Sequence, residues 1–195
     1  MAKKRAIIGF KGVALAPVTK NDILGYASDV AEALPFAGSL NITPKETTQD
    51  IFADDDLYAQ VKDVTGEDIE LRLIELTLED AEKLGLGKLN ATTNTLEYDY
   101  NPEGLTFALR CVCNTVDNAP FYFKRRVFDI TGVRFDNFAT KGSSITVCEA
   151  IITGVTKRPK YAGINMGAII GLLDDETNQT AMDEFLSAAE TFPNP

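Results

Sequence analysis

Apolar and polar residues alternate along much of this sequence, and that period of two limits the fold more than any other feature. Residues 105–113 and 69–73 show it most clearly, with Leu, Phe, Ile or Cys at every second position. Successive side chains of a β-strand point to opposite faces, so this pattern is typical of half-buried strands. Further strands are expected at residues 6–18, 38–52, 57–62, 121–128, 129–138 and 144–155. The sequence therefore predicts a mainly β fold, a β-sandwich or partly open barrel, in a single domain over residues 1–195.

Two short helices are expected beside the strands. The first runs from its N-cap Thr77 to Gly85, a residue that favours the end of a helix, and acidic residues lie in its first turn. The second begins at Thr180 and places apolar residues on one face. Residues 191–195 are expected to fray, whereas residues 28–34 fit either one helical turn or an extended segment.

One contiguous segment carries almost all of the net charge. The chain holds 29 Asp and Glu against 19 Lys and Arg, a formal charge of −10, and 13 of the acids lie between Glu46 and Glu82. At its centre are the three Asp residues 54–56, the expected tip of a long hairpin over residues 38–76, with another turn expected at residues 63–66. This asymmetry indicates an acidic surface with a specific role.

The absence of histidine narrows the chemistry that the chain can perform. His-based acid–base catalysis, Ser–His or Cys–His nucleophiles and His-ligated metals are excluded. Cys111 and Cys113 lie two residues apart in a predicted strand and are expected to be buried free thiols on one face. Residues 54–56 could bind a divalent cation, but they lack the spacing of an EF-hand loop, so a solvated loop or a contact with a basic partner is favoured. No enzymatic activity and no cofactor are predicted, and no apolar run is long enough to span a bilayer.

A basic run interleaved with aromatic residues lies at residues 121–127. Such a surface can bind single-stranded nucleic acid, but the negative charge of the chain makes a contact with an acidic protein surface the better interpretation. A second basic stretch lies at residues 157–160. Basic residues and Pro also protect exposed strand edges, which is the simpler alternative. The candidate basic assembly surface consists of Lys124, Arg125, Arg126, Lys157 and Arg158.

Several short stretches follow one another in an order that matches one protein family. They are residues 9–17, 34–40, 51–55, 66–71 and the helix that ends at residues 84–85. As an ordered set spanning residues 5–175, they resemble the major tail proteins, or tail tube proteins, of long-tailed bacteriophages. The C-terminal extension at about residues 176–195 lies outside the resemblance.

The resemblance implies a β-sandwich protomer with a flanking helix. Six protomers would form a ring, rings would stack into a tube, and inner strands would join into one barrel around a channel. The implied partners are further copies of the chain, the tape measure protein, and the tail terminator and tip proteins, with no membrane contact. Double-stranded DNA would pass through during genome ejection without sequence-specific binding. The protein would assemble in the host cytoplasm and remain in the tail of the virion.

Two sets of residues receive roles under this interpretation. The inter-ring contact loop is expected to comprise Gln49, Asp50, Phe52, Asp54, Asp55, Asp56 and Tyr58. The candidate channel lining is Glu46, Asp50, Glu67, Asp68 and Glu70, because an acidic wall would repel DNA phosphates and let the genome slide. Two alternatives stay open: a stand-alone β-sandwich binding or adhesion module, and the tube protein of a contractile or secretion-type particle.

Overall fold

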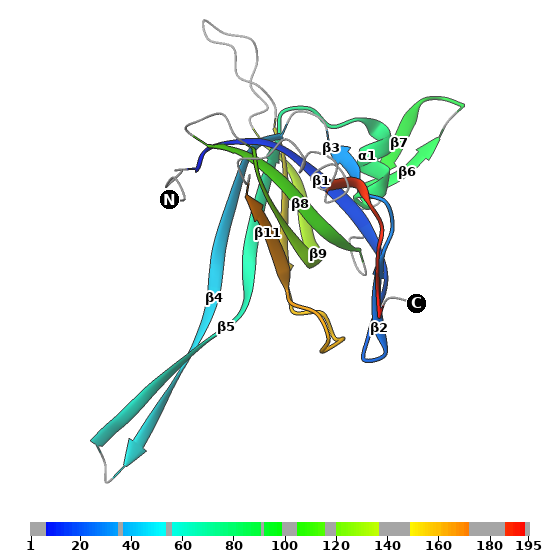
Figure 1. Cartoon of the computed structure of the whole chain (residues 1–195). Coiled ribbons are helices and arrows are strands. Elements are labelled where there is room, and N and C mark those ends of the chain that lie inside the picture. Colours follow the sequence, from blue (N-terminus) through cyan, green and yellow to red (C-terminus); the bar gives the residue numbers. More distant parts are fainter. Residues whose placement is uncertain are drawn as a thin grey trace, which may run out of the picture.

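The computed structural model describes residues 7–34, 37–53, 56–90, 92–98, 105–115, 120–136, 149–171 and 186–193. Most of this part of the chain is extended, as the period of two predicts (Figure 1). The strands are β1 (Ile7–Asp22), β2 (Gly25–Ser28), β3 (Glu32–Leu34), β4 (Ala37–Ala53), β5 (Asp56–Leu73), β6 (Gly87–Asn90), β7 (Thr95–Tyr98), β8 (Thr106–Thr115), β9 (Pro120–Asp136), β10 (Glu149–Thr156), β11 (Gly167–Gly171) and β12 (Glu190–Phe192). The helix is α1 (Leu78–Lys83).

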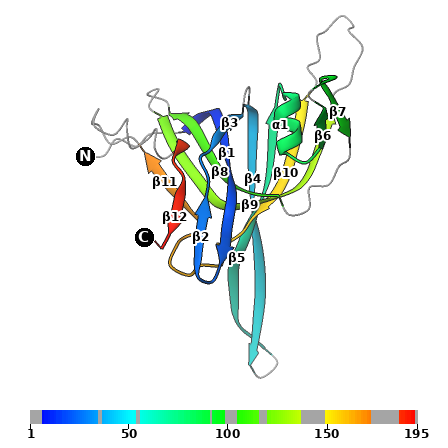
Figure 2. The same ribbon diagram turned by 90° about the vertical axis from the view of Figure 1, so that its right-hand side faces the viewer.

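The strands form one curled, open sheet with the shape of a half-barrel, which confirms the predicted mainly β, partly open architecture. The strand order is β12-β2-β1-β8-β9-β10-β5-β4, with β3 paired to β1 and β11 paired to β9. Every pairing is antiparallel, and β6 and β7 form a separate hairpin beside α1 (Figure 2). Among the residues that the structure describes, the sheet therefore ends at β4 on one side and at β12 on the other.

The main core lies on one face of this sheet and beneath α1. The alternating residues of β5 and β8 supply much of it, and Leu71, Leu109 and Cys111 are fully buried. α1 covers part of this face with Ala81 and Leu84. Each fully buried large apolar side chain contributes about 1.5–3 kcal/mol relative to exposure. The predicted alternation is confirmed here, as are the buried free thiols of Cys111 and Cys113.

α1 begins and ends as its sequence predicts. The Thr77 hydroxyl accepts a hydrogen bond from the Asp80 amide at 3.1 Å, which satisfies one unpaired N–H of the first turn. Gly85 adopts a φ of 75°. The Gly85 amide donates to the carbonyl of Glu82 and the Leu86 amide to that of Ala81, which is a Schellman arrangement.

The turn predicted at residues 63–66 is wrong, because β5 runs through it without interruption. Gly66 pairs with Lys45 across the β4–β5 ladder, and a register shift follows at Lys45 and Glu46. A side chain at Gly66 would place its Cβ 2.3 Å from the carbonyl oxygen of Thr156. This glycine therefore permits a close approach between strands and does not reverse the chain.

The C-terminal region also differs from the prediction. Fraying was expected over residues 191–195, but Thr191 and Phe192 belong to β12 (Glu190–Phe192), which pairs with β2. Leu186 and Ser187 are helical, Ala188 and Ala189 are not, and the first residues of the predicted second helix lie outside the described ranges. Residues 28–34 were expected to form either one helical turn or an extended segment. The structure shows the extended alternative: Ser28 is the last residue of β2, and residues 32–34 form β3. None of the described helices is both long enough and apolar enough to cross a membrane.

Candidate assembly surfaces

β4 and β5 form a two-stranded arm that extends well beyond the body of the molecule (Figures 1 and 2). Their ladder is continuous from the pair Ala37 and Leu73 to the pair Ala53 and Asp56. β10 pairs with β5 only over residues 67–73. Along residues 56–66, β5 therefore has β4 on one side and, among the described strands, none on the other.

The predicted inter-ring contact loop lies at the far end of this arm. The backbones of Gln49, Asp50 and Phe52 belong to β4, and those of Asp56 and Tyr58 to β5. Their side chains, and the whole of Asp54 and Asp55, lie outside the described part. The hairpin position of the acidic segment agrees with the prediction, and its role in contacts between rings stays a prediction.

The predicted channel-lining acids separate onto two faces of β5. Asp68 and Glu70 lie on the polar face, where Asp68 pairs with Lys45 at 2.8 Å and Glu70 pairs with Arg72 at 2.9 Å. The side chains around them form a polar hollow of about 380 Å³, which is lined by Asn41, Thr43, Asp68, Ile69, Glu70, Thr131, Thr153 and Gly154. Glu46 is exposed on β4, and the side chain of Asp50 is not among those described.

Glu67 does not belong to that polar face, which corrects its assignment to the channel lining. Its side chain lies on the core side and the residue is only 8% exposed. Arg125 Nε and Nη2 donate to its two carboxylate oxygens at 2.6 and 2.8 Å, and Thr156 Oγ1 donates at 3.2 Å. The hydrogen bonds from Arg125 lower the pKa of Glu67 despite its burial. Glu67 is therefore part of a buried ion pair.

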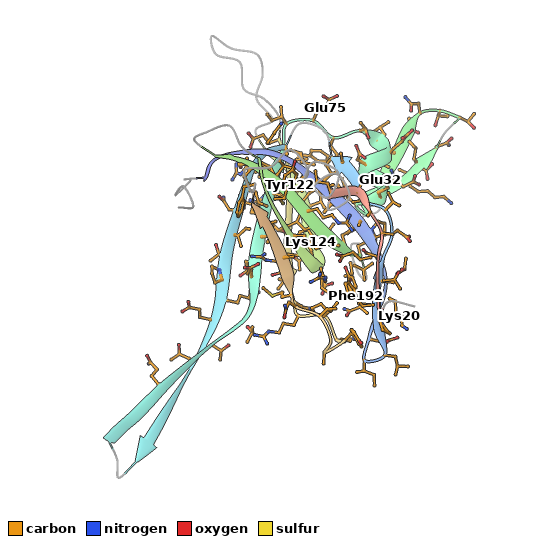
Figure 3. The ribbon with its side chains drawn as sticks, viewed as in Figure 1. Lys20, Glu32, Glu75, Tyr122, Lys124 and Phe192 are labelled. Carbon is orange, nitrogen blue, oxygen red and sulfur yellow. The ribbon has the colours of Figure 1, made fainter. Side chains whose placement is uncertain are left out.

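The side chains of Lys124 and Arg126 lie on the face of β9 opposite to that of Arg125. Both form ion pairs with Glu190 of β12. They are only 8% and 9% exposed, so neither belongs to the predicted basic assembly surface. Arg126 Nε donates to Glu190 Oε2 at 3.1 Å. Its guanidinium also lies 5.3 Å from the centre of the Phe192 ring. Figure 3 shows Lys124 and Phe192 within the body of the molecule.

The two exposed members of the predicted basic surface are Lys157 and Arg158. Lys157 pairs with Asp129 at 2.7 Å. Burial raises the pKa of Glu190, but the hydrogen bond and charge of Lys124 outweigh it, and the net pKa lies below its usual value. The basic run of β9 thus pairs mainly with acids of the same chain, and among the predicted basic residues the exposed ones lie in the loop after β10.

Arg110 of β8 is a buried charge that the sequence analysis did not single out. It is fully buried, and its Nη1 donates to the carbonyl of Leu186 at 2.9 Å. Burial lowers its pKa, and the negative charge of Glu190 acts in the opposite direction. Tyr26 lies in the same cluster; its hydroxyl donates to the carbonyl of Arg126 at 2.7 Å, and burial raises its pKa to about 12.

Comparison with known proteins adds no relative to these observations. A scan against known protein families finds no match, and a search of curated proteins finds none either. Within the described ranges, no group of three or more Cys, Asp or Glu side chains is placed to hold a metal ion. The candidate surfaces are therefore interpreted from their geometry and charge.

Proposed function

We propose that this chain is a structural subunit that forms hexameric rings, and that the rings stack into the tail tube of a long-tailed bacteriophage. In this role the tube conducts DNA out of the particle and performs no chemistry. The observation that carries the proposal is the open half-barrel with a long edge strand. β4 is 17 residues long and has no strand on its outer side among the described residues.

An edge of this length is a liability for a protein that acts alone. It presents a row of backbone N–H and C=O groups with which another chain can pair. A ring of copies satisfies those groups by continuing each open sheet into the next, and a closed barrel has no edges. The half-barrel of one protomer is suited to contribute a segment of such a barrel.

The polar face of the sheet also supports a conduit for DNA. Asn41 and Thr43 are neutral there, and the cations Lys45 and Arg72 of this face are paired with the acids Asp68 and Glu70. A wall of this composition gains no counterion-release affinity for phosphates, whereas a cationic wall would bind DNA strongly. The β4–β5 arm projects beyond the body of the molecule, which fits a contact with a neighbouring ring in a stacked assembly.

The test is to determine the oligomeric state and particle shape of the purified chain. Size-exclusion chromatography with light scattering, followed by negative-stain electron microscopy, is expected to show hexameric rings or tubes of constant diameter. Tubes should lengthen as the protein concentration rises, because stacking is a head-to-tail association. A chain that stays monomeric at all concentrations would contradict the proposal and favour a stand-alone β-sandwich module.

A further inference from the structure

The turn between β1 and β2 carries an exposed apolar knob, defined here as Ile23 and Leu24. The two residues are 78% and 72% exposed. The Asp22 carboxylate accepts hydrogen bonds from the amides of Leu24 and Gly25 at 2.8 and 2.9 Å, which fixes the turn. A fixed turn that presents two adjacent large aliphatic side chains to solvent is suited to contact another surface.

A groove beside α1 has a mainly apolar lining and a volume large enough to receive the knob. Its volume is about 290 Å³. Its apolar lining is Leu15, Pro17, Leu34, Leu84, Leu105 and Phe107. A cavity of about 150 Å³ accommodates a benzene ring, so this groove has room for two aliphatic side chains. Glu32, Asp80 and Lys83 complete its lining, and Lys83 pairs with Glu32.

Apart from Asp22, whose carboxylate caps the turn, the charges beside the knob are basic, whereas those around the groove are mainly acidic. Lys20 is exposed on β1 beside the knob, and the Lys160 amide donates to Asn21 Oδ1 at 2.9 Å. That contact holds the basic loop containing Arg158 and Lys160 against the turn. On the groove side, acids predominate on α1 and β3: Glu32, Glu79, Asp80 and Glu82, with Lys83 as the single base among these five. Complementary rims of this kind favour association and fix its orientation.

We propose that the knob of one copy of this chain seats in the α1 groove of the next copy. In Figures 1 and 2 the β1–β2 turn lies low in the molecule and α1 lies high, and Figure 3 places Lys20 and Glu32 correspondingly. The contact therefore joins two different surfaces and repeats from copy to copy, as stacking requires. It rests on the proposed function and adds a second contact, separate from the β4–β5 arm.

The test is a cross-link between two differently labelled copies. One copy carries Leu24→Cys and an affinity tag, and the other carries Lys83→Cys; both carry Cys148→Ser, and the remaining cysteines, Cys111 and Cys113, are buried. After co-expression and oxidation, a disulfide-linked dimer should form roughly tenfold faster than with a control pair, because docking raises the effective thiol concentration. The control combines Leu24→Cys with Asn41→Cys, which is exposed on the polar face of β4.

Each outcome decides between the two proposals. Cross-linking together with rings or tubes supports both. Tubes that form without the cross-link overturn the knob-and-groove contact and leave the tube function standing. Cross-linking in a preparation that never forms rings or tubes supports the contact and overturns the tube function. A chain that neither cross-links nor assembles overturns both.

Discussion

Lys124 and Arg126 of β9 both form ion pairs with the carboxylate of Glu190, on the face of β9 opposite to Arg125. Replacing Glu190 by Gln keeps its size and removes the carboxylate that pairs with Lys124 and Arg126 and that lies near Arg110. Removing one partner of a buried ion pair costs about 3–5 kcal/mol. The free energy of unfolding, measured by urea denaturation, should fall by that amount.

The matched control for this variant is Glu75→Gln, because Glu75 is exposed (Figure 3). It removes the same charge from the chain and should change the free energy of unfolding by less than about 0.5 kcal/mol. Equal effects of the two substitutions would mean that the buried cluster contributes nothing specific to stability.

The ion pair between Glu67 and Arg125 predicts a distinct dependence of stability on pH. Because folding lowers the pKa of Glu67, its contribution is complete above the ordinary carboxyl pKa and is lost as the pH falls through the folded value. Glu67→Gln should therefore be less stable than the wild type at neutral pH. Its stability should also decline less steeply from roughly pH 5 to pH 3. Urea midpoints measured across this range check the prediction; parallel curves for the two proteins would contradict it.

The sequence could predict which face each basic residue of β9 occupies, but not its partner. Strand alternation alone places Arg125 opposite Lys124 and Arg126. Glu67 lies 58 positions from Arg125, and Glu190 lies 66 positions from Lys124. The order of strands in the sheet brings these acids beside the basic residues. Because that order cannot be read from the sequence, the basic run was interpreted from the sequence as an exposed surface.

Among the elements, the β4–β5 arm is the one whose loss should separate assembly from folding. Thr47 and Asp63 are partners in its ladder, so an Asn-Gly turn in place of residues 48–62 preserves the remaining pairing. Since the distal arm has no third strand beside it in the described part, the body should keep its thermal midpoint. The protomers should fail to form tubes in electron micrographs.

A variant of α1 gives the opposite pattern and controls for stability. Thr77→Ala removes the N-cap hydrogen bond and should lower the free energy of unfolding by about 1 kcal/mol. It should still form the same assemblies as the wild type. Intact tubes from the variant with the shortened arm, or the loss of tubes in Thr77→Ala, would contradict the role proposed for the arm in assembly.

The elements themselves were largely predictable wherever local signals were sufficient. The period of two identified the strands, and Thr77 and Gly85 marked the limits of the helix region. The errors at residues 63–66 and 190–192 have a common cause. Gly66 is required by the nearby carbonyl of Thr156, and β12 is a strand because β2 lies beside it. Neither neighbour is visible in local sequence.

At the scale of the whole molecule, the proposed tube function predicts that the polar face controls how easily DNA moves through the assembled tube. Asn41→Lys, Thr43→Lys and Asp68→Lys together make this face cationic, so it would attract phosphates by counterion release. Phage particles carrying the triple variant should eject DNA more slowly than the wild type. The slowing should diminish as the salt concentration rises.

The control for this experiment reverses acids away from the polar hollow. Glu75→Lys and Glu97→Lys alter exposed residues that do not line it. Particles with these substitutions should eject DNA at the wild-type rate, measured by the fluorescence of a dye that binds released DNA. Ejection at an unchanged rate from the triple variant would rule out the polar face as a channel wall.

The pairing of β12 with β2 also determines when, during synthesis, this part of the sheet can fold. Glu190 pairs with Ser28, and almost the whole sequence separates them. At a translation rate of about 5–20 residues per second, β2 waits on the order of ten to thirty seconds for its partner strand. In the last part of that interval Lys124 and Arg126 have been made but still lack the Glu190 carboxylate, which lies 66 positions beyond Lys124. The chain therefore completes its charged interior only at a late stage of translation, and under the proposed function partly made chains would be poor recruits for a growing tube.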